Sequence, residues 1–115
     1  MIEPDDRQFL LATAWLFSLH GQDDRARALC AALVEADPGD GLAAVALADL
    51  MLDAGEAKEA LSVLRMTRAP KELSRAAALL ETKALSLLGK KTEAARRWSR
   101  YVESAKGPAR TWVKG

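Results

Sequence analysis

Leucine and alanine recur at intervals of three and four residues along most of the chain, which is the spacing of one face of an α-helix. Glycine, proline and aspartate interrupt this pattern and divide it into six apolar segments. We predict helices over about residues 4–20, 23–35, 41–53, 57–66, 71–88 and 92–106. The side chains expected to cap them are Asp23 or Asp24, Ser74 and Thr92. The first segment is apolar nearly all round, so its helix lacks a wide polar face for solvent.

A six-residue segment that begins with glycine and ends with alanine occurs three times. Gly21–Ala26 reads GQDDRA, Gly55–Ala60 reads GEAKEA and Gly89–Ala94 reads GKKTEA, and each begins 34 residues after the one before. One such segment is common by chance, but three in the same register indicate an internal repeat. Each glycine lies between two predicted helices, so the repeating unit is a helix-turn-helix.

These units resemble tetratricopeptide repeats, which have a 34-residue period. In that class the glycine ends the first helix and the alanine lies where the two helices are closest. We therefore predict an all-α fold in which three tetratricopeptide-like repeats form a short right-handed superhelix. The repeats span about residues 7–40, 41–74 and 75–106 of a single domain over 1–106, and residues 107–115 form a tail.

The resemblance implies that the first helix of each repeat lines a concave groove. The positions that point into it are Gln8, Leu11, Trp15, Ser18, Leu19, Leu42, Val45, Asp49, Leu52, Asp53, Ala76, Leu79, Lys83, Ser86 and Leu87. Eight of these are large and apolar, which suits an amphipathic helix of a partner better than solvent. We expect these eight, with Asp49 and Lys83, to bind the partner. The groove does not suit the other familiar tetratricopeptide ligand, an acidic peptide C-terminus held by lysine and asparagine. Leu11 and Trp15 occupy the positions where that binding mode needs a cation and an amide.

Charge is segregated along the chain although the net charge is only +1. Residues 1–89 carry nine basic and fourteen acidic side chains, whereas residues 90–115 carry eight and two. We expect Arg96, Arg97 and Arg100 to form a second contact that attracts an acidic partner. Basic residues interleaved with aromatic ones can also bind single-stranded nucleic acid. The spacing places Trp98 on a different helix face from Arg96 and Arg100, so we expect no nucleic acid partner.

The chain carries little that would support catalysis. Its single histidine, His20, precedes a turn glycine, and its single cysteine, Cys30, lies on a predicted core face. Asp49 and Asp53 lie one turn apart and are expected to pair with Lys83 or with a partner, since no nucleophile accompanies them. We predict no enzyme activity, no cofactor and no metal. With no apolar run of ~20 residues, no signal-like N-terminus and no disulfide pair, we expect a cytoplasmic protein without membrane insertion.

Residues 7–38, RQFLLATAWLFSLHGQDDRARALCAALVEADP, resemble the opening repeat of the YscY-type chaperones of bacterial type III secretion. The shared features are a polar lead, FLL, a Trp-Leu pair, HG at the turn and a leucine-alanine helix that ends in proline. This resemblance implies a cytosolic chaperone for a small, helical, early-exported secretion component. It also implies a heterodimer or higher hetero-complex that docks on the cytosolic part of the export gate. The alternatives are a needle-subunit chaperone of the same systems and a generic tetratricopeptide scaffold or adaptor.

Overall fold

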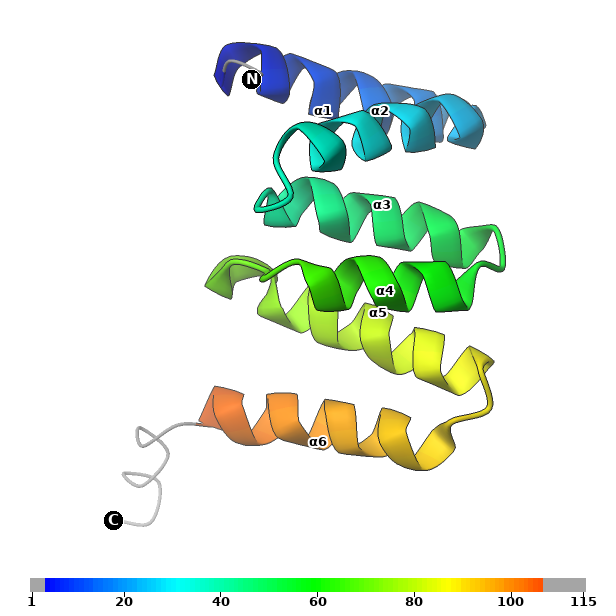
Figure 1. Cartoon of the computed structure of the whole chain (residues 1–115), viewed down its shortest axis with the longest axis vertical. Helices are drawn as coiled ribbons and strands as arrows, with labels where there is room; N and C mark the ends of the chain where they lie inside the picture. The colour runs from blue at the N-terminus through cyan, green and yellow to red at the C-terminus, as the bar shows by residue number, and fades with distance from the viewer. Residues whose placement is uncertain (1–3, 107–115) are drawn as a thin grey trace.

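The computed structural model describes residues 4–106, so the predicted tail lies outside the described residues. This part of the chain contains six α-helices, one short 3-10 helix and no strand, which confirms the predicted all-α fold (Figure 1). The elements are α1 (Pro4–Leu19), α2 (Asp23–Ala36), α3 (Gly41–Asp53), α4 (Ala57–Met66), η1 (Lys71–Leu73), α5 (Ser74–Leu87) and α6 (Lys91–Lys106).

The three repeated glycines end the first helix of each hairpin in the same way. Gly21, Gly55 and Gly89 have φ angles of 74°, 81° and 78°, a left-handed conformation that disfavours residues with a Cβ atom. The N–H of the following residue bonds back to the carbonyl five positions earlier at 2.8 Å in all three turns: Gln22 to Phe17, Glu56 to Met51 and Lys90 to Leu85. This is the Schellman cap, and its 34-residue recurrence explains why glycine repeats at that interval.

Small residues fill the closest contacts between helices of a hairpin. The alanines that end the repeated segments, Ala26, Ala60 and Ala94, are all buried in the structure. Ala14 and Ala48, also 34 residues apart, are buried on the first helices. The equivalent position of α5 is Thr82, whose Oγ1 is buried without a hydrogen-bond partner among the described residues.

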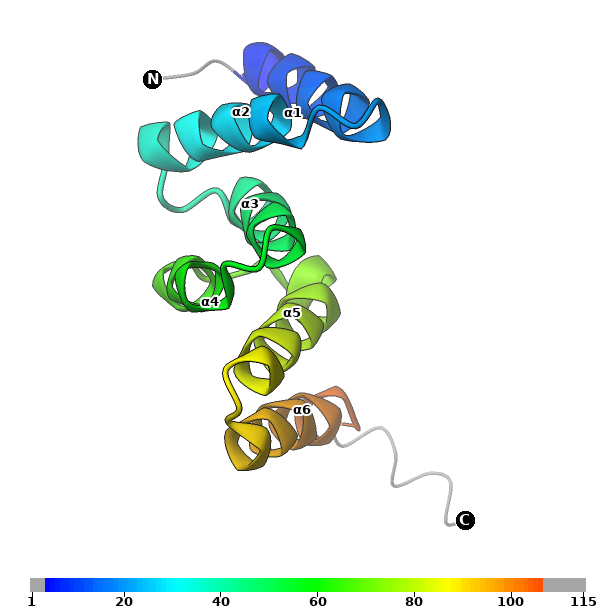
Figure 2. The ribbon, with the colours of Figure 1, turned by 90° about the vertical axis from the view of Figure 1, so that its right-hand side faces the viewer.

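Each helix packs on the next one along the chain, and α5 also contacts α3. In Figure 2, α1, α3 and α5 follow one side of the stack, and α2 and α4 lie on the other. One core cluster joins α3 to α6 around Leu52, Leu61 and Leu85, and a second joins α1 to α3 around Cys30 and Leu47. Met51 packs against both clusters, so the core continues from the first repeat to the third.

The predicted caps at Asp23 or Asp24, Ser74 and Thr92 are wrong. The residue after each turn glycine already takes the N-cap position of the second helix, as Gln22 does, so the two aspartates lie in the first turn of α2. Thr92 lies inside α6 for the same reason, and Ser74 begins α5 with its hydroxyl donating to the Lys71 carbonyl at 2.8 Å. The side-chain cap that the structure does contain is Asp40, which accepts from the Ala43 N–H at 3.2 Å.

Ion pairs connect neighbouring repeats. Arg7 of α1 donates to both carboxylate oxygens of Asp40 at 2.6 and 2.7 Å, and Arg27 of α2 pairs in the same two-pronged way with Glu56. The Asp40 carboxylate is buried, and its hydrogen bond with Arg7 lowers its pKa. Asp40 therefore both caps α3 and ties the first repeat to the second.

Candidate partner-binding groove

The first helices α1, α3 and α5 carry most of the exposed large apolar side chains. Among the large apolar residues predicted for the groove, those with an exposed side chain are Trp15, Leu19, Leu42, Leu79 and Leu87. Trp15 is 64% exposed and Leu87 58%, whereas Leu11 and Val45 are half-buried. Exposed apolar side chains on the first helices of three successive repeats are typical of a surface that contacts another protein.

Leu52 is the exception, and its predicted place in the groove is wrong. It is only 4% exposed and belongs to the core cluster that contains Ala84 and Leu85 of α5. The physical reason is the direct packing of α5 on α3, which covers this position of α3. Leu52 therefore stabilises the contact between the second and third repeats.

A small cavity of about 130 Å³ opens between α1 and α3. Its lining brings together Leu11, Trp15 and Ser18 of α1 with Asp49 of α3, all of them predicted groove positions. The buried Cys30 and Ala14 form part of its lining on the core side. A cavity of this size can hold about one large apolar side chain.

The groove also carries carboxylates that remain without an ion pair. Asp49 and Asp53 make no contact within 4 Å of a basic group among the described residues, so the predicted pairing with Lys83 does not form in the unbound chain. Partial burial raises the pKa of Asp49, the nearby Asp53 raises it further, and Lys83 opposes both effects. Two carboxylates without an ion pair and the nearby Lys83 therefore lie together among the predicted groove positions.

Comparison with known proteins identifies the repeat. A family model of the tetratricopeptide repeat matches residues 17–84, from the last turn of α1 to the body of α5. The chain belongs to the tetratricopeptide-repeat family. No curated protein matches the chain. Tetratricopeptide repeats generally mediate protein–protein contacts, so the family indicates a protein-binding scaffold or adaptor.

The three arginines predicted to form a second contact on α6 differ in their surroundings. Arg97 is largely buried and donates to Glu81 of α5 at 3.1 Å, so it joins the two helices of the third repeat. Arg96 and Arg100 are exposed and form no ion pair among the described residues. Trp98 and Tyr101 are half-buried, with ring centroids 5.2 Å apart.

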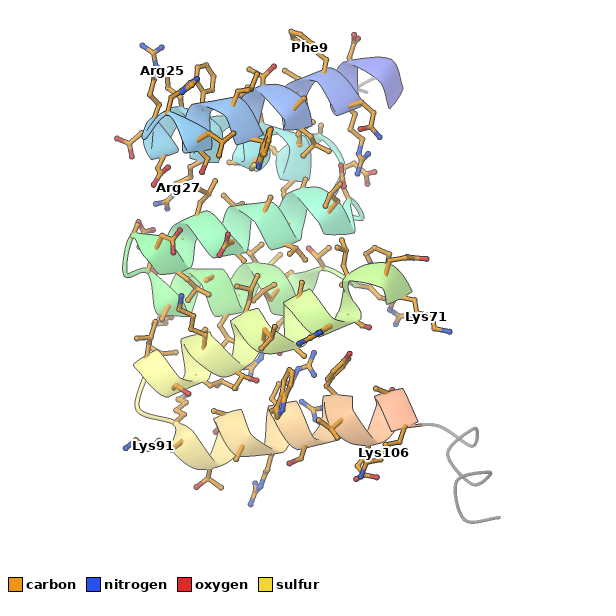
Figure 3. All side chains as sticks on the ribbon, turned by 180° about the vertical axis from the view of Figure 1, so that it is seen from behind. Phe9, Arg25, Arg27, Lys71, Lys91 and Lys106 are labelled. Atoms are coloured by element: carbon orange, nitrogen blue, oxygen red, sulfur yellow. The ribbon has the colours of Figure 1, made fainter. Side chains whose placement is uncertain are left out.

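Sequence reasoning missed one feature of this tetratricopeptide surface and anticipated another. The first is Arg65 of α4, which lines the same open cleft as Arg96 and Arg100, and only the stacking of repeats brings it there. The second is the end of the stack, where Phe9 is exposed and points away from the molecule (Figure 3). Leu16, seven residues later, is also exposed. The absence of a polar face on the first predicted helix was the signal for this second feature.

The residues considered for chemistry are spread apart. His20 is exposed at the end of α1, and Cys30 is buried, which raises the pKa of its thiol. Within residues 4–106 no group of three His, Cys, Asp or Glu side chains lies close enough to hold a metal ion. None of the helices described is long and apolar enough to cross a membrane.

Proposed function

We propose that this tetratricopeptide protein is a chaperone that binds an amphipathic helix of a partner in the groove lined by α1, α3 and α5. The observation that carries the proposal is that these three helices leave five large apolar side chains exposed at the predicted groove positions. An amphipathic helix would cover them with apolar anchors three, four and seven residues apart. The half-buried Leu11 and Val45 would form part of the floor beneath those anchors.

The polar groups of the groove limit which helix fits. In the proposed complex one apolar anchor enters the cavity beside Trp15, whose lining includes Asp49. A basic side chain next to that anchor faces Asp49 and also Asp53, which lies one helical turn further along α3. A basic partner residue would pair with the two carboxylates, whereas an acidic one would be repelled. The expected partner segment is therefore apolar along one stripe and carries a lysine or arginine near its centre.

We further propose that the partner is a small, helical, early-exported component of a type III secretion system. The support is the resemblance of residues 7–38 to the opening repeat of YscY-type chaperones, together with the exposed apolar side chains of α1. In this role the chain stabilises its partner in the cytosol, within a heterodimer or higher hetero-complex, and presents it to the export apparatus. A needle subunit of the same systems is the alternative partner.

Co-expression with the small proteins encoded beside this chain tests the proposal. Trp15→Asp with Leu79→Asp places two charges on the groove and should abolish co-purification of the partner. The matched control is Leu16→Asp with Met66→Asp, which changes two exposed apolar residues outside the groove positions. Both variants should keep the helical circular dichroism of the wild type, since no buried side chain is altered. Continued co-purification with the groove variant, or loss with the control alone, would contradict a concave binding site.

A further inference from the structure

We propose that the cleft between α4 and α6, called here the basic cleft, binds an acidic peptide segment of a second protein. The cleft consists of two adjoining open hollows of about 740 and 1210 Å³, which share Arg65, Arg97 and Arg100 in their linings. Its basic side chains come from α4, η1 and α6, with α5 residues such as Glu81 at its floor, whereas the predicted groove residues that the proposed function uses are not in its lining. The two surfaces can therefore be tested independently.

The lining of the basic cleft carries an excess of positive charge. Its basic side chains are Arg65, Lys71, Arg96, Arg97, Arg100 and Lys106, and its acidic ones are Glu81, Glu93 and Glu103. Two of the acids are already paired, Glu81 with Arg97 and Glu103 with Lys106. The other four basic groups form no ion pair with a described residue. Lys71 of η1 and Lys106 of α6 lie on the same side of the stack (Figure 3).

The unpaired basic side chains of the cleft do not stabilise the fold. Arg96 and Arg100 are separated by four residues on one helix, and like charges at that spacing repel each other. The Arg97–Glu81 pair, by contrast, is largely shielded and holds α6 on α5. Arg97 therefore fixes the position of the helix, while Arg65, Arg96 and Arg100 keep their guanidinium groups available for an anion.

The chemistry of the cleft favours a carboxylate-bearing peptide. Guanidinium groups bind carboxylates in a two-pronged geometry, which this chain already uses at Arg7–Asp40. Nucleic acid fits less well, because Glu93 and the paired acids would face its continuous row of phosphates. Stacking on bases also needs free aromatic faces, whereas Trp98 and Tyr101 are half-buried against each other.

The length of the cleft sets the length of its ligand. The α6 helix has 16 residues and is about 24 Å long at 1.5 Å per residue. An extended peptide of about seven residues covers that distance. A suitable probe is a fluorescein-labelled peptide of about eight alternating glutamate and serine residues, long enough to follow α6.

Fluorescence anisotropy with this peptide tests the proposal on the full chain. Wild-type protein should bind it at low salt, and binding should weaken as the ionic strength rises. Arg65→Gln with Arg100→Gln removes two exposed, unpaired groups shared by both hollows, so the fold should persist. The affinity should fall roughly a hundredfold, since two charge-assisted contacts are lost and each accounts for about a factor of ten.

The matched control is Lys58→Gln with Lys90→Gln, which makes the same change in net charge at exposed residues outside both linings. The control should keep its affinity within about twofold, because rim charges outside a contact contribute little. Equal weakening in both variants would overturn the proposal, since the attraction would then come from net charge alone. The proposal also fails if the wild type does not bind the peptide at low salt, or if it prefers a single-stranded RNA of equal length.

Discussion

Replacement of Gly55 by alanine tests the repeat register directly. Gly55 has a φ angle of 81°, and a Cβ atom added there would meet no atom within 4 Å. Any loss of stability must therefore come from the backbone conformation rather than from a clash. The left-handed conformation costs a residue with a Cβ atom roughly 1–2 kcal/mol, and the lower entropy of the unfolded alanine variant offsets about 0.4–1 kcal/mol.

The expected net loss for Gly55→Ala is about 1 kcal/mol in the free energy of unfolding. In a domain of roughly 100 residues this lowers Tm by about 4–6 °C, which a circular dichroism melt resolves. Gly55→Val should lose more, because a β-branched side chain fits this conformation worse. Gly21→Ala should match Gly55→Ala, since that turn has the same geometry and the same open space.

Gly55→Asn is the control, because asparagine tolerates the left-handed region better than alanine. Its Tm should lie between those of the alanine variant and the wild type. An unchanged Tm for Gly55→Ala would refute the reasoning, and so would an asparagine variant less stable than the alanine variant. Either result would mean that the turn does not need a positive φ at this position.

Three further predictions concern core packing and the Asp40 ion pair. Leu52→Ala should lower the free energy of unfolding by about 2–5 kcal/mol in urea melts. Leu79→Ala changes an exposed residue and should alter this free energy by less than about 0.5 kcal/mol. Similar losses in the two variants would mean that Leu52 is not in the core. Thr82→Val should raise stability by about 1 kcal/mol, because it removes a buried unpartnered hydroxyl, and a loss would show that the hydroxyl has a partner. The pKa of Asp40 is lowered in the folded state, so its stabilising contribution is present above about pH 4 and is lost as the pH falls further through the folded-state pKa. Urea melts from pH 6 to 3 should therefore show a steeper loss for the wild type than for Asp40→Asn, and parallel curves would contradict the role of the Arg7 pair.

The fold was predictable from the sequence because its repeating signals are local. A glycine at Gly21, Gly55 and Gly89 is required by the backbone angle of one turn, and that requirement can be recognised without knowledge of the neighbouring repeats. The helix bounds followed from the same turns. The predictions of Asp23 or Asp24 and of Thr92 as caps were wrong, because the turn itself supplies the N-cap position and leaves no need for a side chain there.

The candidate site was only partly predictable because it depends on distances between helices. Leu52 and Leu79 both occupy predicted groove positions, yet the close packing of α5 on α3 buries the first and leaves the second exposed. Arg65 joins Arg100 in the basic cleft through the spacing of α4 and α6, which no pattern within one helix specifies. The apolar surface of α1 was visible in the sequence, since its helix lacks a polar face.

Site-specific photo-crosslinking in the co-expressed complex tests the central claim most directly. A photoreactive phenylalanine analogue is placed at Leu79 on the groove side, and in a second preparation at Met66, which is 81% exposed at the end of α4. Because both positions are exposed in the free chain, a difference between them reports where the partner lies. The account predicts that the partner is cross-linked at position 79 and not at position 66. Cross-linking at position 66 with none at position 79 would place the partner on the second helices and contradict a groove formed by α1, α3 and α5.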